Sequence, residues 1–213
     1  MNRPTLYVLW IACVLCAFPA PAAEPTKPPE VIKGEGFAIV VPAAWRDMKN
    51  PPGKIVLFRQ GDGAKNVPAV DETGQPLQIG LLVERYPNTK DAIEDGIQKL
   101  ARNAQNDPRL ERIGPAAIDK VKLTDGADAM LLTNEFVKDA KRHSLQLKML
   151  VKDAADNGYV VSAFVVAGKE SKLAGRDSAL VAWLAAHVKS FCLDAAKVDV
   201  KPVEQAQTAR DAK

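Results

Sequence analysis

The chain contains two histidines, His143 and His187, the side chains best suited to acid–base chemistry or metal binding near neutral pH. A zinc site gathers several His, Cys or carboxylate ligands, and its histidines and cysteines usually recur at short spacing. Neither histidine has a second His or Cys at such a spacing. We therefore interpret both as structural or surface residues, and we expect no metal ion or other cofactor.

Serine hydrolysis needs a serine whose hydroxyl reaches a histidine that is itself oriented by a carboxylate. The sequence has no G-x-S-x-G motif. Ser144 follows His143 directly, but neighbours on a strand point to opposite faces, so these two residues cannot act together. The chain is accordingly predicted not to be an enzyme. The serines beyond residue 23 are Ser144, Ser162, Ser171, Ser178 and Ser190.

Phosphate-binding and calcium-binding loops also require patterns that this chain lacks. Gly34-Glu35-Gly36 and Gly61-Asp62-Gly63 have no third glycine, no Lys-Ser or Lys-Thr pair and no helix directly after them, so both are predicted to be turns. Asp62, Asp71 and Glu72 lack the close alternating spacing of a calcium loop.

Glu84 and Glu135 are a candidate carboxylate pair, because each lies in a predicted strand and could meet the other across a sheet. Two carboxylates at a suitable separation perform glycoside hydrolysis. The pairing register decides whether the two residues meet. A solvated face of the sheet is the alternative.

Aromatic and arginine side chains near the strand ends could form a binding surface, because Trp, Tyr and Arg dominate the energetics of protein interfaces. Alternatively, both tryptophans fill the core between sheet and helices, where large aromatic side chains also belong. We favour this second interpretation. The residues concerned are Trp45, Arg46, Arg59, Arg85, Tyr86 and Trp183.

Residues 1–23 have the layout of a secretory signal peptide. A positively charged start is followed by an apolar run from Leu6 to Phe18 and then by small residues. The run is shorter than the roughly 20 residues of a membrane-spanning helix. We expect cleavage after Ala22 or Ala23, a periplasmic or secreted mature chain, and no stable membrane insertion.

Cleavage there removes Cys13 and Cys16 and leaves Cys192 alone, so no internal disulfide is expected. Cys192 follows Phe191 at the end of an apolar segment and is predicted to be a small buried residue. The alternative is a reactive or intermolecular thiol. It has weak support, because Lys189 is the sole Lys or His within three residues.

The charges of the chain do not favour nucleic acid or an anionic membrane surface as a partner. The sequence has 29 Lys and Arg against 26 Asp and Glu, and removal of Arg3 with the leader leaves 28 − 26 = +2. Basic and acidic residues are interleaved, as on an ordinary solvated surface. So small an excess gives little electrostatic attraction for either polyanion.

The remaining chain is predicted to hold one domain. Residues 24–33 carry three prolines and no period, and we interpret them as a linker. The domain is predicted over residues 34–193, and the polar residues 194–213 are predicted to be a flexible tail.

The periodicity of the domain predicts the element order β-β-β-α-β-β-β-β-α. The first helix is expected to open near Asn88 or Thr89, either of which could cap it, and the second to close the domain within residues 171–191. This order predicts an α+β fold in which amphipathic helices pack on the faces of a predominantly antiparallel sheet. The predicted strands are 36–42, 54–59, 77–86, a ragged one within 109–123, 129–137, 143–152 and 159–167.

The last three strands form the best-patterned stretch, Gly126–Gly168. The middle strand alternates apolar and polar residues, whereas the third is apolar at nearly every position, as in a strand covered on both faces. Asn157-Gly158 is predicted to form the tight turn between them. We interpret residues 159–167 as the core of the sheet.

The strand Gly36–Pro42, followed at once by Trp45, resembles the opening strand of PsbP-like and DcrB-like proteins. The later order of a helix after the third strand, a long meander and a last helix ending in Lys189-Ser190-Phe191 is also similar over residues 34–193. The resemblance implies a compact PsbP-like α/β/α sandwich, usually in exported proteins, with accessory or binding roles rather than catalysis.

We therefore expect an exported accessory protein that binds a protein partner in the cell envelope. The alternative is a carrier of a small apolar ligand with a pocket between the sheet and a helix. The sequence defines neither the binding residues nor the oligomeric state. We expect function to lie in the loops around Trp45 and Gly61–Pro76.

The export hypothesis can be tested on the full-length chain expressed in its own cells. Because cleavage is expected after Ala22 or Ala23, mass spectrometry of the mature protein should find an N-terminus at Ala23 or Glu24. A mature chain that still begins at Met1 would contradict the signal-peptide interpretation.

Overall fold

The computed structural model describes residues 28–43, 45–47, 54–59, 70–107, 110–138 and 140–212, with the backbone alone for residues 46, 47 and 54–59. The predicted signal peptide, the glycine pair at 61–63 and the side chains of Arg46 and Arg59 lie outside this description.

Strands and helices follow one another nearly as the periodicity predicts. Their bounds are β1 Glu30–Gly34, β2 Phe37–Val41, β3 Arg46–Asp47, β4 Lys54–Arg59, β5 Gln78–Tyr86, α1 Ile93–Gln105, β6 Leu110–Arg112, β7 Ala117–Lys122, β8 Asp128–Lys138, β9 Arg142–Lys152, β10 Gly158–Gly168, α2 Ala179–Lys189, the 3-10 turn η1 Ala195–Lys197, and α3 Lys201–Asp211.

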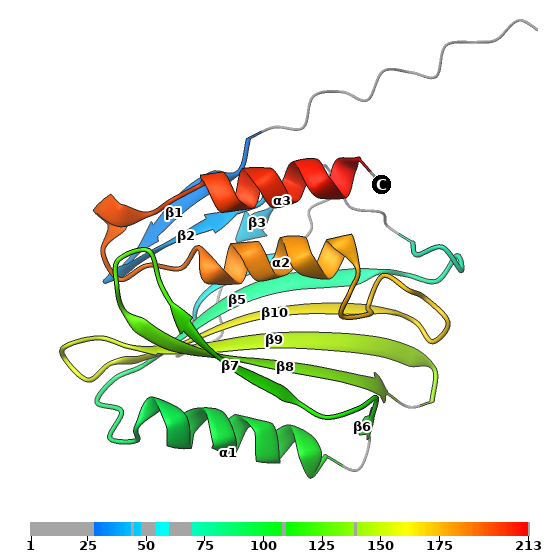
Figure 1. Ribbon diagram of the computed structural model, residues 1–213, viewed down its shortest axis with the longest axis horizontal. Helices are drawn as coiled ribbons and strands as arrows, with labels where there is room; N and C mark the ends of the chain where they lie inside the picture. The colour runs from blue at the N-terminus through cyan, green and yellow to red at the C-terminus, as the bar shows by residue number, and fades with distance from the viewer. Residues whose placement is uncertain are drawn as a thin grey trace, which may run out of the picture.

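The described strands form a large antiparallel sheet and a separate β1–β2 hairpin. The order in the sheet is β3-β4-β5-β10-β9-β8-β6, and β7 also pairs with β8. Helix α1 covers one face, while α2, α3 and the hairpin lie over the other (Figure 1). The expected α+β fold, an antiparallel sheet with helices on both faces, is confirmed.

β10 occupies the middle of this sheet. It pairs with β5 on one side and with β9 on the other, so its residues are covered by neighbours as well as by the helix layers. Val161 and Val165 are fully buried toward α2, and Val160 is buried toward α1. Continuous apolar sequence is what such a strand needs, since a polar side chain on either face would lose its water.

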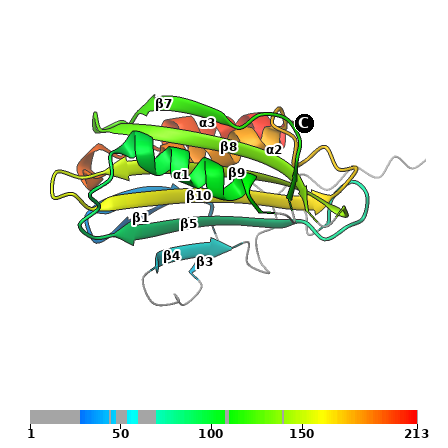
Figure 2. The ribbon, with the colours of Figure 1, turned by 90° about the horizontal axis from the view of Figure 1, so that it is seen from below.

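The two faces of the sheet bury cores of very different size. Beneath α2 and the hairpin lies one large cluster that includes Phe37, Tyr159 and Phe191, whose rings contact one another at centroid distances of 5.5–6.1 Å. Beneath α1 the cluster of buried residues is small: Ile97, Ala101, Leu132, Leu150 and Val160. Figure 2 shows α1 lying along the sheet on this side.

The start of α1 differs from the sequence prediction. The helix begins at Ile93 with Ala92 at its N-cap, and no side chain caps it. Asn88 instead adopts a left-handed backbone with φ 53°, and the Thr89 hydroxyl donates to the Tyr86 carbonyl. The predicted capping residues therefore shape the turn that leaves β5, because Asn and Thr stabilise turns as readily as helix ends.

The turn between β9 and β10 is present, but Asp156 rather than the predicted Asn157-Gly158 pair takes the left-handed conformation, with φ 62°. The Asp153 carboxylate accepts from the backbone N–H groups of Ala155 and Asn157 at 2.9 and 2.8 Å. This side-chain bonding stabilises the turn one residue earlier than the Asn-Gly signal indicates.

The predicted linker 24–33 is corrected at its end, because Glu30–Gly34 forms β1. Residues Glu30 to Gly34 pair antiparallel with β2 through a turn in which Gly36 has φ 75°. The domain thus begins before residue 34. Two prolines directly before this strand conceal it in the sequence, although Ile32 packs against the main core.

The predicted flexible tail 194–213 is also corrected, because Lys201–Asp211 forms helix α3. Pro202 lies in its first turn, a favoured place for proline. Val203 is fully buried and Ala206 packs against the core, which places α3 against α2. Its apolar stripe is too short to be recognised by hydropathy alone.

An arginine completes that stripe. The Arg210 guanidinium lies 4.4 Å from the centroid of the Trp183 ring, and its Nη2 atom pairs with Asp211 Oδ1 at 2.7 Å. The Arg210 side chain is 10% exposed. A cation over an indole face, with its aliphatic stem buried, contributes to packing. Hydropathy scales treat arginine as polar and therefore do not reveal this contribution.

Replacement of Arg210 should weaken the docking of α3. Arg210→Ala removes the cation–π contact and the buried stem, so we expect the free energy of unfolding to fall by roughly 1–2 kcal/mol. Urea denaturation measures this change, and Lys201→Ala, at an exposed position of the same helix, is the control. Equal stability of both variants would contradict the role given to Arg210.

Candidate functional site

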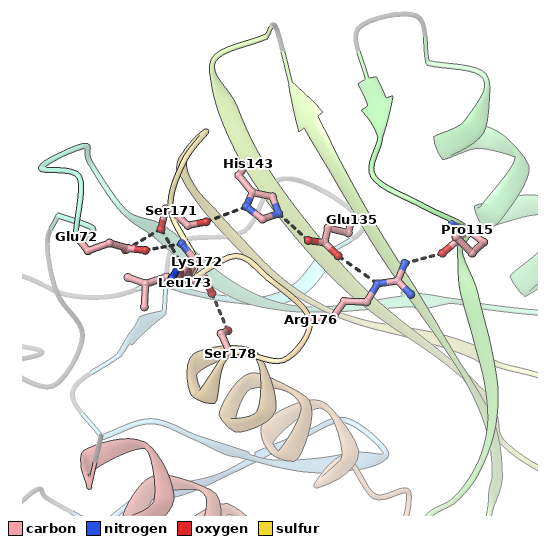
Figure 3. A network of polar contacts seen from close by, with 9 residues as sticks. All are labelled: Glu72, Pro115, Glu135, His143, Ser171, Lys172, Leu173, Arg176 and Ser178. Carbon is pink, nitrogen blue, oxygen red and sulfur yellow. Dashed lines mark hydrogen bonds and ion pairs between the residues drawn. The ribbon is translucent and has the colours of Figure 1, made fainter.

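A groove of about 1090 Å³ lies beside the loop 169–178, which connects β10 to α2. Its walls come from this loop, from the start of α2, from the end of α3, and from Glu135 and His143 on β8 and β9. Side chains from distant parts of the chain converge here (Figure 3).

His143 and Glu135 form the centre of the polar network. They share the α2 face of the sheet because Val137 pairs with His143 and Glu135 lies two residues before Val137. His143 Nε2 is 2.8 Å from Glu135 Oε1, and Nδ1 is 3.0 Å from the Ser171 carbonyl oxygen. The two side chains are 11% and 13% exposed.

Arg176 holds the other oxygen of Glu135. Its Nε lies 3.3 Å from Glu135 Oε2, and its Nη2 donates to the Pro115 carbonyl at 2.5 Å. One guanidinium therefore connects the loop 169–178 to β8 and to the turn before β7. Planar arginine is suited to this task because its donors point in several fixed directions.

Glu72 holds the loop from the opposite side. Its Oε2 accepts from the Ser171 hydroxyl at 2.8 Å, and its Oε1 accepts from the backbone N–H of Lys172. Ser171 Oγ also accepts from the Leu173 N–H. These bonds hold down the pKa of Glu72 against the effect of burial, which would raise it.

Asp71, beside Glu72, anchors the same segment at the end of β10. Its Oδ2 accepts from the Gly168 N–H at 2.5 Å, while Oδ1 accepts from Thr73 and Gln75. Burial opposes its ionisation, but these hydrogen bonds dominate and lower its pKa to about 2. Asp71 and Glu72, considered in the sequence as cation ligands, instead bind backbone and hydroxyl groups.

The bonding at His143 does not reproduce a hydrolytic triad. Both ring nitrogens of His143 face acceptors, the Ser171 carbonyl oxygen and the Glu135 carboxylate. The Ser171 hydroxyl donates to Glu72 rather than to the ring. The arrangement links the loop 169–178 to the sheet. The register also confirms the prediction that His143 and Ser144, as neighbours on one strand, point to opposite faces.

The outer rim of the groove carries exposed charges of both signs. Lys169 and Lys172 alternate with Glu170, and Asp177 follows on the same loop. Among the described residues, none of these four side chains has an ion-pair partner. The inner residues of the groove are bonded to one another, and the rim charges are available to a ligand.

The two tryptophans belong to the core, as the favoured interpretation predicts. Trp45 and Trp183 are 8% and 1% exposed, and their rings meet edge to face at 6.0 Å. Arg85 pairs with Glu35 at 3.2 Å, whereas Tyr86 is 49% exposed. The aromatic and arginine residues therefore do not gather into one patch within the described part of the chain.

Glu84 and Glu135 do not meet. Strands β10 and β9 separate β5 from β8. Across β10 and β9, the registers align Glu84 with Val160 and then with Met130 on β8. Met130 is five residues from Glu135, and side chains an odd number of residues apart point to opposite faces of a strand. The two carboxylates therefore lie on opposite faces of the sheet. The candidate carboxylate pair is excluded by this register.

Cys192 is a buried free thiol, as predicted. Burial is the main reason that its pKa is raised, and the adjacent Asp125 carboxylate adds to this effect. A raised pKa keeps the sulfur in its unreactive thiol form. The alternative of a reactive cysteine is not favoured by this environment.

His187 is buried between α2 and β2. Its Nδ1–H donates to the Val40 carbonyl at 2.7 Å, and its ring meets Trp183 edge to face. Burial lowers its pKa to about 4, and the nearby Arg210 charge acts in the same direction. His187 is thus neutral at pH 7, and it is a structural histidine, one of the two possibilities that the sequence leaves open.

No group of three or more His, Cys, Asp or Glu side chains within the described residues could hold a metal ion. Among these residues, no helix is long and apolar enough to cross a bilayer.

No protein-family model and no curated protein sequence matches this chain. Several solved structures resemble it. The Ran-binding protein Mog1p of Saccharomyces cerevisiae is 14% identical, with 82% of this chain and 97% of that chain covered and a TM-score of 0.49. PsbP of the cyanobacterium Synechocystis is 13% identical, covering 78% and 92% at a TM-score of 0.44.

LpqN of Mycobacterium tuberculosis, described as involved in cell envelope biogenesis, is 15% identical, covering 63% and 72% at a TM-score of 0.41. Likenesses this distant carry no function to the chain. One of these structural neighbours is a PsbP protein, and membership of a PsbP-like or DcrB-like family stays a prediction.

The depressed pKa of His187 should make stability depend on pH. The unfolded imidazole takes up a proton near pH 6.5 but the folded one near pH 4, so protons favour the unfolded chain between these values. We expect the free energy of unfolding to fall by roughly 3 kcal/mol as pH drops through this window.

Urea denaturation at several pH values measures this fall. His187→Gln has no imidazole to protonate at this position, so the free energy of unfolding of this variant should decrease less between pH 6.5 and pH 4. His143→Gln is the control, because it keeps His187. An unchanged slope in His187→Gln would show that another group causes the pH dependence.

Proposed function

We propose that this chain is an exported, non-catalytic accessory protein that binds a protein partner in the cell envelope. The observation that carries the proposal is the groove beside residues 169–178, whose rim presents exposed charges of both signs. Such a rim suits a protein partner, because the rims of protein–protein interfaces are polar and solvent-accessible.

The inner network supports recognition rather than chemistry. Glu135, His143 and Arg176 bond to one another and to backbone carbonyls, so they hold the loop in one position. A loop fixed before binding loses less conformational freedom when a partner docks. The rim residues then contact the partner while the network remains intact.

The proposal commits to a partner segment that carries both acidic and basic residues. Lys169 and Lys172 would pair with its carboxylates, and Glu170 and Asp177 with its cations. Complementary rim charges raise the association rate and the salt sensitivity more than they raise affinity. The export part of the proposal rests on the predicted signal peptide.

Site-specific photo-crosslinking in intact cells tests the groove. A photoreactive residue replacing Lys172 should capture a defined envelope protein, whereas the same residue replacing Lys120, exposed on β7, should not. The double variant Lys169→Glu, Lys172→Glu should then bind the captured protein more weakly, by about two- to ten-fold, with a smaller dependence on salt.

Lys120→Glu is the matched charge control for the binding measurement. Capture from both positions alike, or affinity unchanged by the double variant, would exclude the groove as the binding site.

A further inference from the structure

A second hollow, of about 410 Å³, lies between α1 and strands β9 and β10 on the face of the sheet opposite to the groove. Leu150 and Val160 form its floor. Ile93, Gly96 and Leu100 form the wall that α1 provides. The lining is mainly apolar.

The hollow exists because the apolar stripe of α1 is wider than its contact with the sheet. Ile97 and Ala101 are buried, but Ile93 and Leu100, on the flank of the same stripe, are partly exposed. At Gly96 a Cβ atom would lie 2.5 Å from Leu150 Cδ2, so the helix approaches the sheet closely where it has no side chain. Ile93 and Leu100, beside this contact, pack against the cluster beneath α1 and keep part of their apolar surface exposed.

Lysines stand at the polar rim of the hollow. Lys152 pairs with Asp156 at 2.9 Å. Lys99, midway along α1, has neither an ion-pair nor a hydrogen-bond partner among the residues that the structure describes. Asp91, in the segment before α1, also lines the hollow and adds one carboxylate to its rim.

We propose that this hollow binds a single-chain amphiphile with an anionic head, such as a fatty-acid carboxylate or an alkyl phosphate. The acyl chain would cover Ile93, Leu100, Leu150 and Val160, and the head would lie at the Lys99 ammonium. A mainly apolar cavity whose lining includes Lys99, a lysine without an ion-pair partner in the described part of the chain, has the composition of a small-ligand site. This site is separate from the proposed protein-binding groove, and either can exist without the other.

The experiment is an NMR titration of the full mature chain with decanoate below its micellar concentration. We expect saturable shifts of the backbone amides of Ile93, Gly96, Leu100 and Val160, and similar shifts with decyl phosphate. Butyrate keeps the head but lacks the long chain, and decyltrimethylammonium keeps the chain but reverses the head charge. Both should bind at least several-fold more weakly.

Two variants test the two halves of the site. Leu100→Trp fills the hollow and should weaken decanoate binding by more than ten-fold. Lys99→Glu reverses the head-group contact at an exposed position and should weaken binding by roughly two- to ten-fold. Arg102→Glu, an exposed charge reversal on α1 outside the lining, is the matched control and should bind as the unmodified chain does.

Three results would overturn the proposal. They are linear, non-saturating shifts up to the micellar concentration, equal binding of decanoate and decyltrimethylammonium, and decanoate binding unaffected by Lys99→Glu. If Leu100→Trp fails to fold, as circular dichroism would show, Lys99→Glu still decides the outcome, because its side chain is exposed.

Discussion

The double pairing of β10 is the constraint on which the rest of this structure depends. β10 exchanges hydrogen bonds with β5 and β9 over most of its length, so neither of its edges is free. Helices lie over both faces of the sheet (Figure 1), and most β10 side chains are buried. Its register places Ala167 opposite His143, and its end at Gly168 determines where the loop 169–178 begins. The groove lies where it does because the central ladder stops there.

The sequence predicts this centre well, and the physical reason is simple. Alternation in 143–151 identifies a strand with one face toward the core, and unbroken apolar sequence in 159–167 identifies a strand covered twice. The stripe of α1 likewise follows from its spacing alone. Apolar residues recur along the chain with the period of the strand or helix that buries them, so a single sequence is enough to predict these elements.

Contacts that do not depend on apolar periodicity are missed. Helix α3 packs through an arginine on an indole, and β1 follows two prolines, so neither has a strong pattern. At the groove, Glu72 contacts Ser171 and Lys172, which are 99 and 100 residues away in the chain. The signal that could have found Glu135 and His143 is the β8–β9 register, because it places them as diagonal neighbours.

The contact between Trp45 and Trp183 gives this molecule an optical property. The sequence has three tryptophans, and residues 24–213 contain two of them, packed against each other at a centroid distance of 6.0 Å. Arg210 covers one ring and His187 meets its edge. The indole fluorescence of residues 24–213 therefore originates from a single buried cluster, where α2, α3 and the segment after β2 pack together. The wavelength of maximum emission of this cluster reports whether these three segments are packed.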